Sequence, residues 1–274
     1  MSNIIFYFSG TGNSLAVASA VAEKMTDTEV VSIIALRENK IIPQYYEKIG
    51  FVYPTCFSHA PKIVMDLVKG LQLHSNQKIF LIATCGGGQG FALSDMKQQL
   101  QSSTENAIQE FSVSLPGNHI IGFSAWPKFY QNILFNRAKK TIDKIVYQIQ
   151  NNIPTKPIRT PPFPKGFAFI QKTLNEKVLG VPDIHNSHLE FYTTDACDHC
   201  GICEKLCLAY NIKVSSNNVQ FGDKCEQCMA CIQWCPKRAI SHPNVPKKRK
   251  RYHHPDIKLD DMLKAGKTER NIFD

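Results

Sequence analysis

The sequence has no long apolar run and no export signal. No stretch approaches the roughly 18 consecutive apolar residues of a membrane-spanning helix, so we expect no transmembrane segment. The first residues, MSNIIFYFSGTG, lack the basic start, the longer apolar core and the small-residue cleavage site of a secretory signal. We therefore expect a soluble, cytoplasmic protein whose cysteines stay reduced, which disfavours a disulfide framework.

Two nucleotide-binding signatures are also absent. The loop Ser9–Ser14 contains two glycines, but no Gly-Lys-Ser/Thr follows, so it is not a Walker loop. Leu15 stands where the dinucleotide fingerprint has its third glycine. The rest of the composition is ordinary for a globular protein, with 43% apolar and 20% charged residues. A length of 274 residues suggests one or two domains.

What the sequence does have is a repeated cysteine pattern. Eight of the ten cysteines form two runs, Cys197-x2-Cys200-x2-Cys203-x3-Cys207 and Cys225-x2-Cys228-x2-Cys231-x3-Cys235. This spacing binds [4Fe-4S] clusters in bacterial two-cluster proteins, where the fourth cysteine of each run ligates the other cluster. Zinc needs only four ligands and does not account for the third cysteine at the same short spacing in each run. The sequence therefore predicts two [4Fe-4S] clusters and electron transfer.

The first 150 residues alternate between strand and helix patterns. Apolar runs at 4–8, 29–35, 49–53, 78–84 and 110–115 predict five strands. Helical patterns lie between and after them, at 15–25, 60–71, 91–101 and 131–150. Such an alternation predicts an α/β domain with a parallel sheet covered by helices on both faces.

Three loops follow strands of this predicted sheet, where ligands bind at the carboxyl ends. The first offers backbone N–H groups and hydroxyls at a helix N-terminus, and so can hold a phosphate without a cationic side chain; it comprises Ser9, Gly10, Thr11, Gly12, Asn13 and Ser14. The second supplies aromatic faces and hydroxyls from Tyr53, Pro54, Thr55, Cys56, Phe57 and Ser58. The third offers close backbone approach to a flat ring at Thr84, Cys85, Gly86, Gly87 and Gly88. Each loop alone is compatible with an ordinary turn, and Tyr53 and Phe57 with core packing; together they favour a flavin mononucleotide (FMN) site.

With these motifs in place, the sequence resembles two known families joined in one chain. SGTGNS after the first strand is similar to the phosphate loop of flavodoxins, and the two cysteine runs are similar to a bacterial 2[4Fe-4S] ferredoxin. The combination resembles the flavodoxin–ferredoxin fusion proteins of anaerobic microbes. This resemblance implies a doubly wound, parallel five-stranded flavodoxin-like sheet of order 2-1-3-4-5, followed by a small α+β ferredoxin-like domain.

The resemblance also implies roles for individual residues. Residues 9–14 would bind the FMN phosphate, and residues of the second and third loops would flank the isoalloxazine ring. One cluster would take Cys197, Cys200, Cys203 and Cys235, and the other Cys225, Cys228, Cys231 and Cys207. Two departures stand out, because Leu208 follows Cys207 where Pro236 follows Cys235, and because the ring loops lack the tryptophan that many flavodoxins use.

The predicted organisation is a flavodoxin-like domain at 1–153, a proline-rich linker with a short helix at 154–188, a ferredoxin domain at 189–245 and a basic tail at 246–274. The helix is expected at 166–180, and a short strand over Leu189 to Thr194 enters the ferredoxin domain. Cys56 and Cys85 are expected to be buried packing residues.

The run Lys247-Lys248-Arg249-Lys250-Arg251 is interpreted either as a solvated segment or as a docking patch for an acidic redox partner protein. Nucleic acid ranks last, because neither an aromatic platform nor a zinc finger accompanies the run.

The predicted function is a relay of electrons between FMN and the two clusters, to or from a redox partner, with no catalytic side chain. In one interpretation the protein is a carrier without a substrate of its own. In the alternative it is an oxidoreductase in which NAD(P)H or a quinone reacts at the flavin and the clusters are the electron exit. The absence of a second nucleotide fingerprint favours the carrier.

Overall fold

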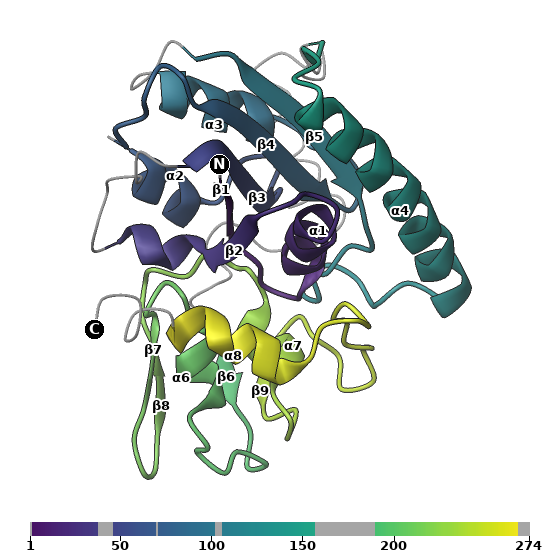
Figure 1. Cartoon of the computed structure of the whole chain (residues 1–274). Helices are drawn as coiled ribbons and strands as arrows, with labels where there is room; N and C mark the ends of the chain where they lie inside the picture. Colours follow the sequence, from purple (N-terminus) through teal and green to yellow (C-terminus); the bar gives the residue numbers. More distant parts are fainter. Residues whose placement is uncertain (1, 38–45, 70, 102–105, 157–189, 268–274) are drawn as a thin grey trace, which may run out of the picture.

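A computed structural model describes residues 2–37, 46–69, 71–101, 106–156 and 190–267 (Figure 1). Its larger part is built on five parallel strands in the order β2-β1-β3-β4-β5, as predicted. The strands are β1 (Ser2–Tyr7), β2 (Thr28–Ser32), β3 (Tyr46–Pro54), β4 (Lys78–Cys85) and β5 (Ile108–Ser114). The inner strands are apolar almost throughout because both faces of the sheet are covered.

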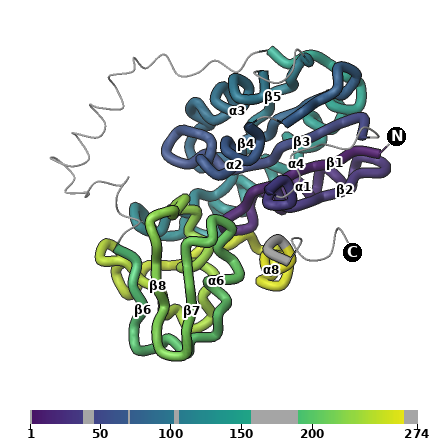
Figure 2. The backbone as a smooth tube through the Cα atoms, turned by 90° about the vertical axis from the view of Figure 1, so that its left-hand side faces the viewer, coloured from purple at the N-terminus to yellow at the C-terminus, as the bar shows by residue number. Residues whose placement is uncertain are grey.

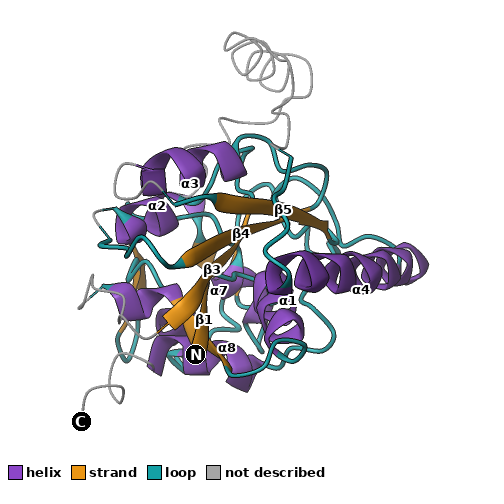
Figure 3. Ribbon diagram, turned by 45° about the horizontal axis from the view of Figure 1, so that its top comes forward, coloured by secondary structure: helices purple, strands orange, loops and turns teal. Residues whose placement is uncertain are grey.

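The helices of this larger part cover the two faces of the sheet in pairs. They are α1 (Asn13–Ala22), α2 (Lys62–Val68), α3 (Ala92–Gln101) and α4 (Lys128–Gln150). α1 contacts α4 on one face, and α2 contacts α3 on the other (Figure 3). A short 3-10 helix at Ile33–Leu36 ends the apolar run that was predicted as one strand at 29–35. The doubly wound flavodoxin-like fold is therefore confirmed.

The smaller part is rich in cysteine and has little regular structure. Two antiparallel pairs form it, β6 (Tyr192–Thr193) with β9 (Ile240–Ser241) and β7 (Ile212–Val214) with β8 (Val219–Phe221). Its helices are α6 (Ile202–Leu206), α7 (Ala230–Trp234) and α8 (Leu259–Lys267). Figures 1 and 2 show this part lying against one end of the sheet domain, with the β7–β8 hairpin pointing away from it.

The two parts share apolar packing. A second core contains Phe191, Met229, Ile232 and Ile240 of the smaller part together with Ile120 and Ile121, which follow β5. Leu206, Leu208, Ala230 and Trp234 belong to the main core of the sheet domain. The helix predicted at 166–180 lies outside the described residues. No helix among the described ranges has the length and apolar character needed to cross a bilayer.

Candidate functional site

The first loop, residues 9–14, connects β1 to the N-terminus of α1 in a tight turn. Gly12 has φ 92°, a left-handed conformation that favours glycine, and its N–H donates to Ser9 Oγ at 3.1 Å. The carbonyl groups of the loop are turned towards the smaller part, since Trp234 Nε1 donates to Gly10 O at 3.1 Å and His254 N donates to Thr11 O at 2.9 Å. This orientation leaves the N–H groups facing the other way.

The N–H groups of Gly10, Thr11, Asn13 and Ser14 have no acceptor within the described part of the chain. The loop is nevertheless largely buried, with Ser9, Thr11 and Ser14 no more than 4% exposed. Buried N–H groups are almost always paired, so a row of unpaired ones at a helix N-terminus fits an anion that completes the pairing.

Side chains around this loop hold its shape. Ser14 Oγ lies 2.8 Å from Thr84 Oγ1, which ties the loop to the end of β4. Asn118 Nδ2 donates to Thr11 Oγ1 at 2.9 Å, and the Tyr252 hydroxyl donates to Asn13 Oδ1 at 2.6 Å. Neither Asn118 nor Tyr252 was predicted from the sequence, because neither belongs to a motif and both reach the loop only through the fold.

The second and third loops lie side by side at the same sheet edge. Thr55 N donates to Thr84 O at 2.8 Å, and the Cys56 and His59 backbones pair in a tight turn that exposes Phe57 and Ser58. Gly86, Gly87 and Gly88 are exposed, and a Cβ placed on Gly87 or Gly88 would meet nothing within 4 Å. The backbone here is open to a flat ring.

Two side chains expected at the ring lie in the core instead. Tyr53 is fully buried, and its hydroxyl donates to Ala92 O at 3.1 Å. Cys85 is buried and its Sγ points to Val113 O at 3.9 Å. Tyr53 fits the alternative interpretation of a packing aromatic, so only the backbone near these positions is available to a ligand. The Cys56 thiol is also enclosed: burial, with a smaller contribution from Glu226, raises its pKa to about 12.

The eight cysteines of the runs gather around two cavities. One cavity, the inner one, is lined by Cys207, Cys225, Cys228 and Cys231. The other, the outer one, is lined by Cys197, Cys200, Cys203 and Cys235. Each set thus combines three cysteines of one run with the fourth cysteine of the other.

The two runs also share a backbone conformation. Positive φ angles occur at His199 and Gln227, at Gly201 and Met229, and at Tyr210 and Arg238, and each pair has the same spacing as Cys197 and Cys225. Asn211 N donates to Cys207 Sγ at 3.2 Å, and Ala239 N donates to Cys235 Sγ at 3.3 Å. Each fourth cysteine therefore receives an N–H from the residue four positions later. Burial raises the pKa of Cys228 and Cys231 well above the usual range of a thiol.

The inner cavity lies directly against the sheet domain. A Cβ on Gly10 would lie 2.0 Å from the carbonyl oxygen of Cys228, so the two backbones are in van der Waals contact. Glu226 Oε1 accepts a hydrogen bond from Ile63 N at 2.9 Å, and Phe8 forms part of the cavity wall. The outer cavity is nearer the surface, where Cys200 is exposed.

Two arginines from outside the runs approach the fourth cysteines. Arg37, after β2, donates to Leu208 O at 3.0 Å and lies over the Tyr210 ring, 4.2 Å from its centroid. Arg251 donates to Arg238 O and to Ile240 O, both at 2.9 Å, and its charge lies beside Cys235. The sequence did not predict that either arginine lies beside a cysteine, although Arg251 belongs to the basic run 247–251.

The basic segment is partly built into the fold. Arg249 Nη1 donates to Ile120 O at 2.7 Å and to Ile121 O at 2.5 Å. The run 247–251 is therefore not fully solvated, because the guanidinium groups of Arg249 and Arg251 donate hydrogen bonds to backbone carbonyl groups. Lys247, Lys248 and Lys250 are exposed. The chain then continues across the first loop, where Tyr252, His254 and Ile257 are buried.

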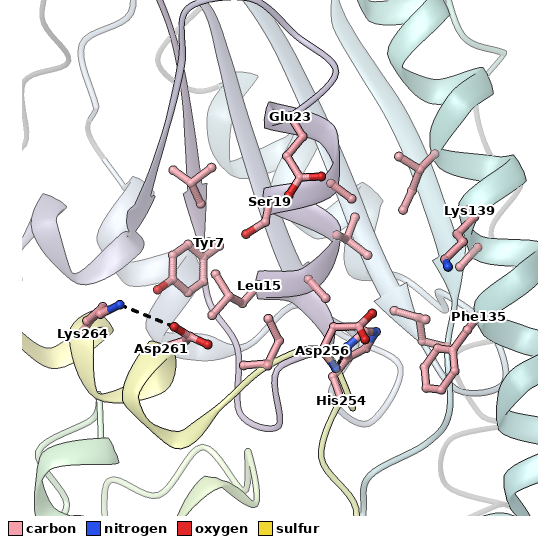
Figure 4. A pocket seen from close by; sticks show the side chains of 18 residues that line it. Tyr7, Leu15, Ser19, Glu23, Phe135, Lys139, His254, Asp256, Asp261 and Lys264 are labelled. Carbon is pink, nitrogen blue, oxygen red and sulfur yellow. Dashed lines mark hydrogen bonds and ion pairs between the residues drawn. The ribbon is translucent and has the colours of Figure 1, made fainter.

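A cavity of about 620 Å³ lies over the outer side of α1, between α4 and α8 (Figure 4). Apolar residues such as Leu15, Phe135 and Ile257 line it, with Tyr7 and Asp261 at one end and His254 and Lys139 at the other. It contains none of the residues predicted from the three loops or the cysteine runs.

Known structures show only distant likeness. Rubredoxin oxygen:oxidoreductase from Desulfovibrio gigas is 14% identical over 56% of this chain, with a TM-score of 0.37, and this chain covers only 37% of its length. A flavodoxin from Streptococcus pneumoniae TIGR4 is 14% identical over 56% of this chain and 99% of its own, with a TM-score of 0.38. The flavodoxin of Megasphaera elsdenii is 20% identical over 40% of this chain and 84% of its own, with a TM-score of 0.30. No curated protein sequence matches the chain.

A family model described as a flavodoxin domain matches residues 4–141. The match includes all five strands of the sheet, the first loop and the first half of α4. Because the match spans half of the sequence and agrees with the observed strand order, the chain belongs to the flavodoxin domain family.

Proposed function

We propose that the protein transfers electrons between an FMN in the sheet domain and two [4Fe-4S] clusters in the cysteine-rich part, to or from a redox partner. One observation carries the proposal: the eight cysteines form two sets of four around separate cavities, and the inner set touches the loop that begins α1. The cofactors would therefore be neighbours within a single fold.

The FMN part of the proposal rests on family membership and on the three loops. The unpaired N–H groups of Gly10, Thr11, Asn13 and Ser14 would be the donors to a phosphate, and they need no cationic side chain. Phe57 and the exposed glycines 86–88 would face the ring. Bound FMN supplies a group that accepts two electrons and can release them singly.

The cluster part of the proposal rests on the arrangement of the sulfur atoms and their surroundings. In the described residues, no three His, Cys, Asp or Glu side chains converge on a single metal ion. Four cysteines line each of the two cavities, and backbone N–H donors to sulfur are among the features that tune cluster potentials.

The polypeptide's own contribution is to place and shield these groups. The contact between Gly10 and Cys228 keeps the inner set beside the proposed phosphate loop, where the half-buried Cys228 and Cys231 are partly shielded from water. The outer set continues the path towards the surface at Cys200. Electrons would therefore pass between the ring loops, the inner cysteine set and the outer cysteine set, in that order. This transfer requires no acid, base or nucleophile.

An alternative is a reductase in which NAD(P)H or a quinone reacts directly at the flavin. The open space above Gly87 and Gly88 favours access by a small molecule. The clusters would then carry electrons away from the flavin. This alternative shares the cofactors and differs only in what reduces them.

The test is anaerobic purification followed by analysis of cofactors and their reduction. We expect about eight iron, eight sulfide and one FMN per chain. A ratio of eight, eight and zero would contradict the flavin, and iron without sulfide would contradict the clusters. Titration with NADH and NADPH then separates the two functions: rapid bleaching of the flavin supports the reductase, whereas reduction only by dithionite or by a reduced carrier protein supports the relay.

A further inference from the structure

An unbroken row of aromatic side chains runs over the surface from the second loop to α4. Phe57 and His119 meet edge to face at a centroid distance of 5.3 Å, and Phe123 lies 6.4 Å from His119. Trp126 follows at 6.4 Å from Phe123, and Tyr130 at 5.2 Å from Trp126. We call this row, with the adjacent Phe129 and Ile133, the aromatic surface.

Most of the aromatic surface is exposed, and part of it packs closely on the backbone. Phe129 is 69% exposed, Ile133 is 41%, and Phe123 and Tyr130 are each 39%. Phe123 rests on Gly117, where a Cβ would lie 2.8 Å from its ring. Large apolar groups gathered in this way on a soluble fold usually mark an interaction site.

Positive charge borders this surface. Lys250 N donates to Ser124 Oγ at 3.1 Å, and Ala125 N donates to Lys250 O at 3.1 Å, so the basic segment runs beside the aromatic row. Lys128, Lys247, Lys248 and Lys250 are exposed there. Residues 115–135 and 242–252 contain no Asp or Glu, so no carboxylate in these segments neutralises the lysines.

We propose that the aromatic surface and its lysines dock an acidic redox partner protein. An apolar patch on the partner would cover Phe129 and its neighbours, and carboxylates around that patch would meet the lysines. Because the row begins at Phe57 in the ring loop, docking here places the partner beside the proposed flavin. This inference rests on the proposed function. It places the site of electron exchange on the flavin side, whereas the outer cysteine set would be a second site of exchange with a partner.

The test measures electron transfer to a small bacterial ferredoxin of net negative charge by anaerobic stopped flow. The protein is used as the full chain, with both clusters and FMN reduced by dithionite. For the wild type we expect the bimolecular rate constant to fall by about tenfold between low and high salt. Phe129→Ala should lower the rate constant by about tenfold at both salt concentrations, because it removes an apolar anchor. Lys247→Gln with Lys248→Gln should lower it at low salt only.

Two matched controls lie on the same protein far along α4. Tyr147→Ala removes an aromatic side chain that is 62% exposed, and Lys140→Gln with Lys144→Gln removes two exposed charges. Neither control should change the rate constant. If the aromatic and lysine variants behave like these controls, the docking surface is wrong.

The aromatic surface could instead bind a second copy of the chain or a membrane, and either result would overturn the proposal. A wild-type dimer that Phe129→Ala converts to a monomer would identify a contact between two copies. Sedimentation with phosphatidylserine vesicles that depends on Phe129, with unchanged electron transfer, would identify a membrane. Failure of the proposed function is distinguishable, because cofactor content and dithionite reduction are measured on each variant before mixing.

Discussion

Gly10 is the residue at which the backbones of the two parts touch. Its missing side chain leaves room for the Cys228 carbonyl, and the Trp234 indole then reaches its carbonyl oxygen. A glycine in a phosphate loop is commonly explained by close approach of the ligand. Here the Cα of Gly10 faces the polypeptide that carries the inner cysteine set.

We predict that Gly10→Ala destabilises the contact between the two parts. Its Cβ would overlap a backbone oxygen that cannot rotate away, so the cost should be about 1–3 kcal/mol. Urea unfolding under anaerobic conditions, followed by circular dichroism and cluster absorbance, measures this change. Gly88→Ala is the control, since its Cβ meets nothing within 4 Å. Equal stability of the two variants would contradict the close contact.

The difference between Leu208 and Pro236 has a packing explanation at the residue scale. Leu208 is 7% exposed and belongs to the core of the sheet domain, whereas Pro236 is exposed beside the outer cavity. The sequence shows that leucine follows Cys207 where proline follows Cys235, but it does not show why. The reason is that the residue after Cys207 faces the sheet domain. Leu208 fills an apolar interface that only the inner set possesses.

At the scale of the elements, the strands and helices of the sheet domain were predictable from the sequence. The segment that packs over the loop 9–14, which comprises residues 252–257 and α8 and is called here the covering segment, was not. The apolar runs at 49–53 and 78–84 became β3 (Tyr46–Pro54) and β4 (Lys78–Cys85), because buried parallel strands are recognisable by composition alone. Residues 252–257 and α8 were assigned to a basic tail. Tyr252 and Ile257 are isolated apolar residues there, and only the folded loop 9–14 gives them a place to pack.

This covering segment gives a prediction at the scale of the element. Tyr252→Phe removes the hydroxyl that donates to Asn13, and leaves that amide oxygen without its donor. The expected loss of unfolding free energy is about 1 kcal/mol. Tyr147→Phe, on the exposed side of α4, should stay within about 0.5 kcal/mol of the wild type. If Tyr252→Phe loses no more unfolding free energy than Tyr147→Phe, the covering segment does not hold the loop.

At the scale of the whole molecule, the spacing of the cysteines predicted which four belong together. The structure adds where each set of four lies relative to the sheet domain. The cysteine motif predicted two sets of four cysteines, and the same two sets line the two cavities. Which set lies inside depends on packing between domains, for which the sequence carries no local signal. The same is true of Arg37, which reaches the smaller part from a segment 171 residues away in the sequence.

The proposed crossed ligation of the two clusters gives a prediction for the whole molecule. Cys207→Ala should remove the inner cluster and leave about four iron atoms per chain, because Cys207 shares a cavity with Cys228. The electron paramagnetic resonance spectrum of the remaining reduced cluster should match that of Cys228→Ala and differ from that of Cys200→Ala. Cys235→Ala should match Cys200→Ala instead. A spectrum of Cys207→Ala that matches Cys200→Ala would show that each run ligates its own cluster.

The covering of the first loop also sets an order of events during synthesis. Trp234 and Gly10 are 224 residues apart, and Tyr252 and Asn13 are 239 apart. At the usual speed of translation, tens of seconds separate the appearance of the loop from that of its cover. The loop therefore leaves the ribosome well before Trp234 and Tyr252, so its contacts with these two residues form only after the sheet domain has been synthesised.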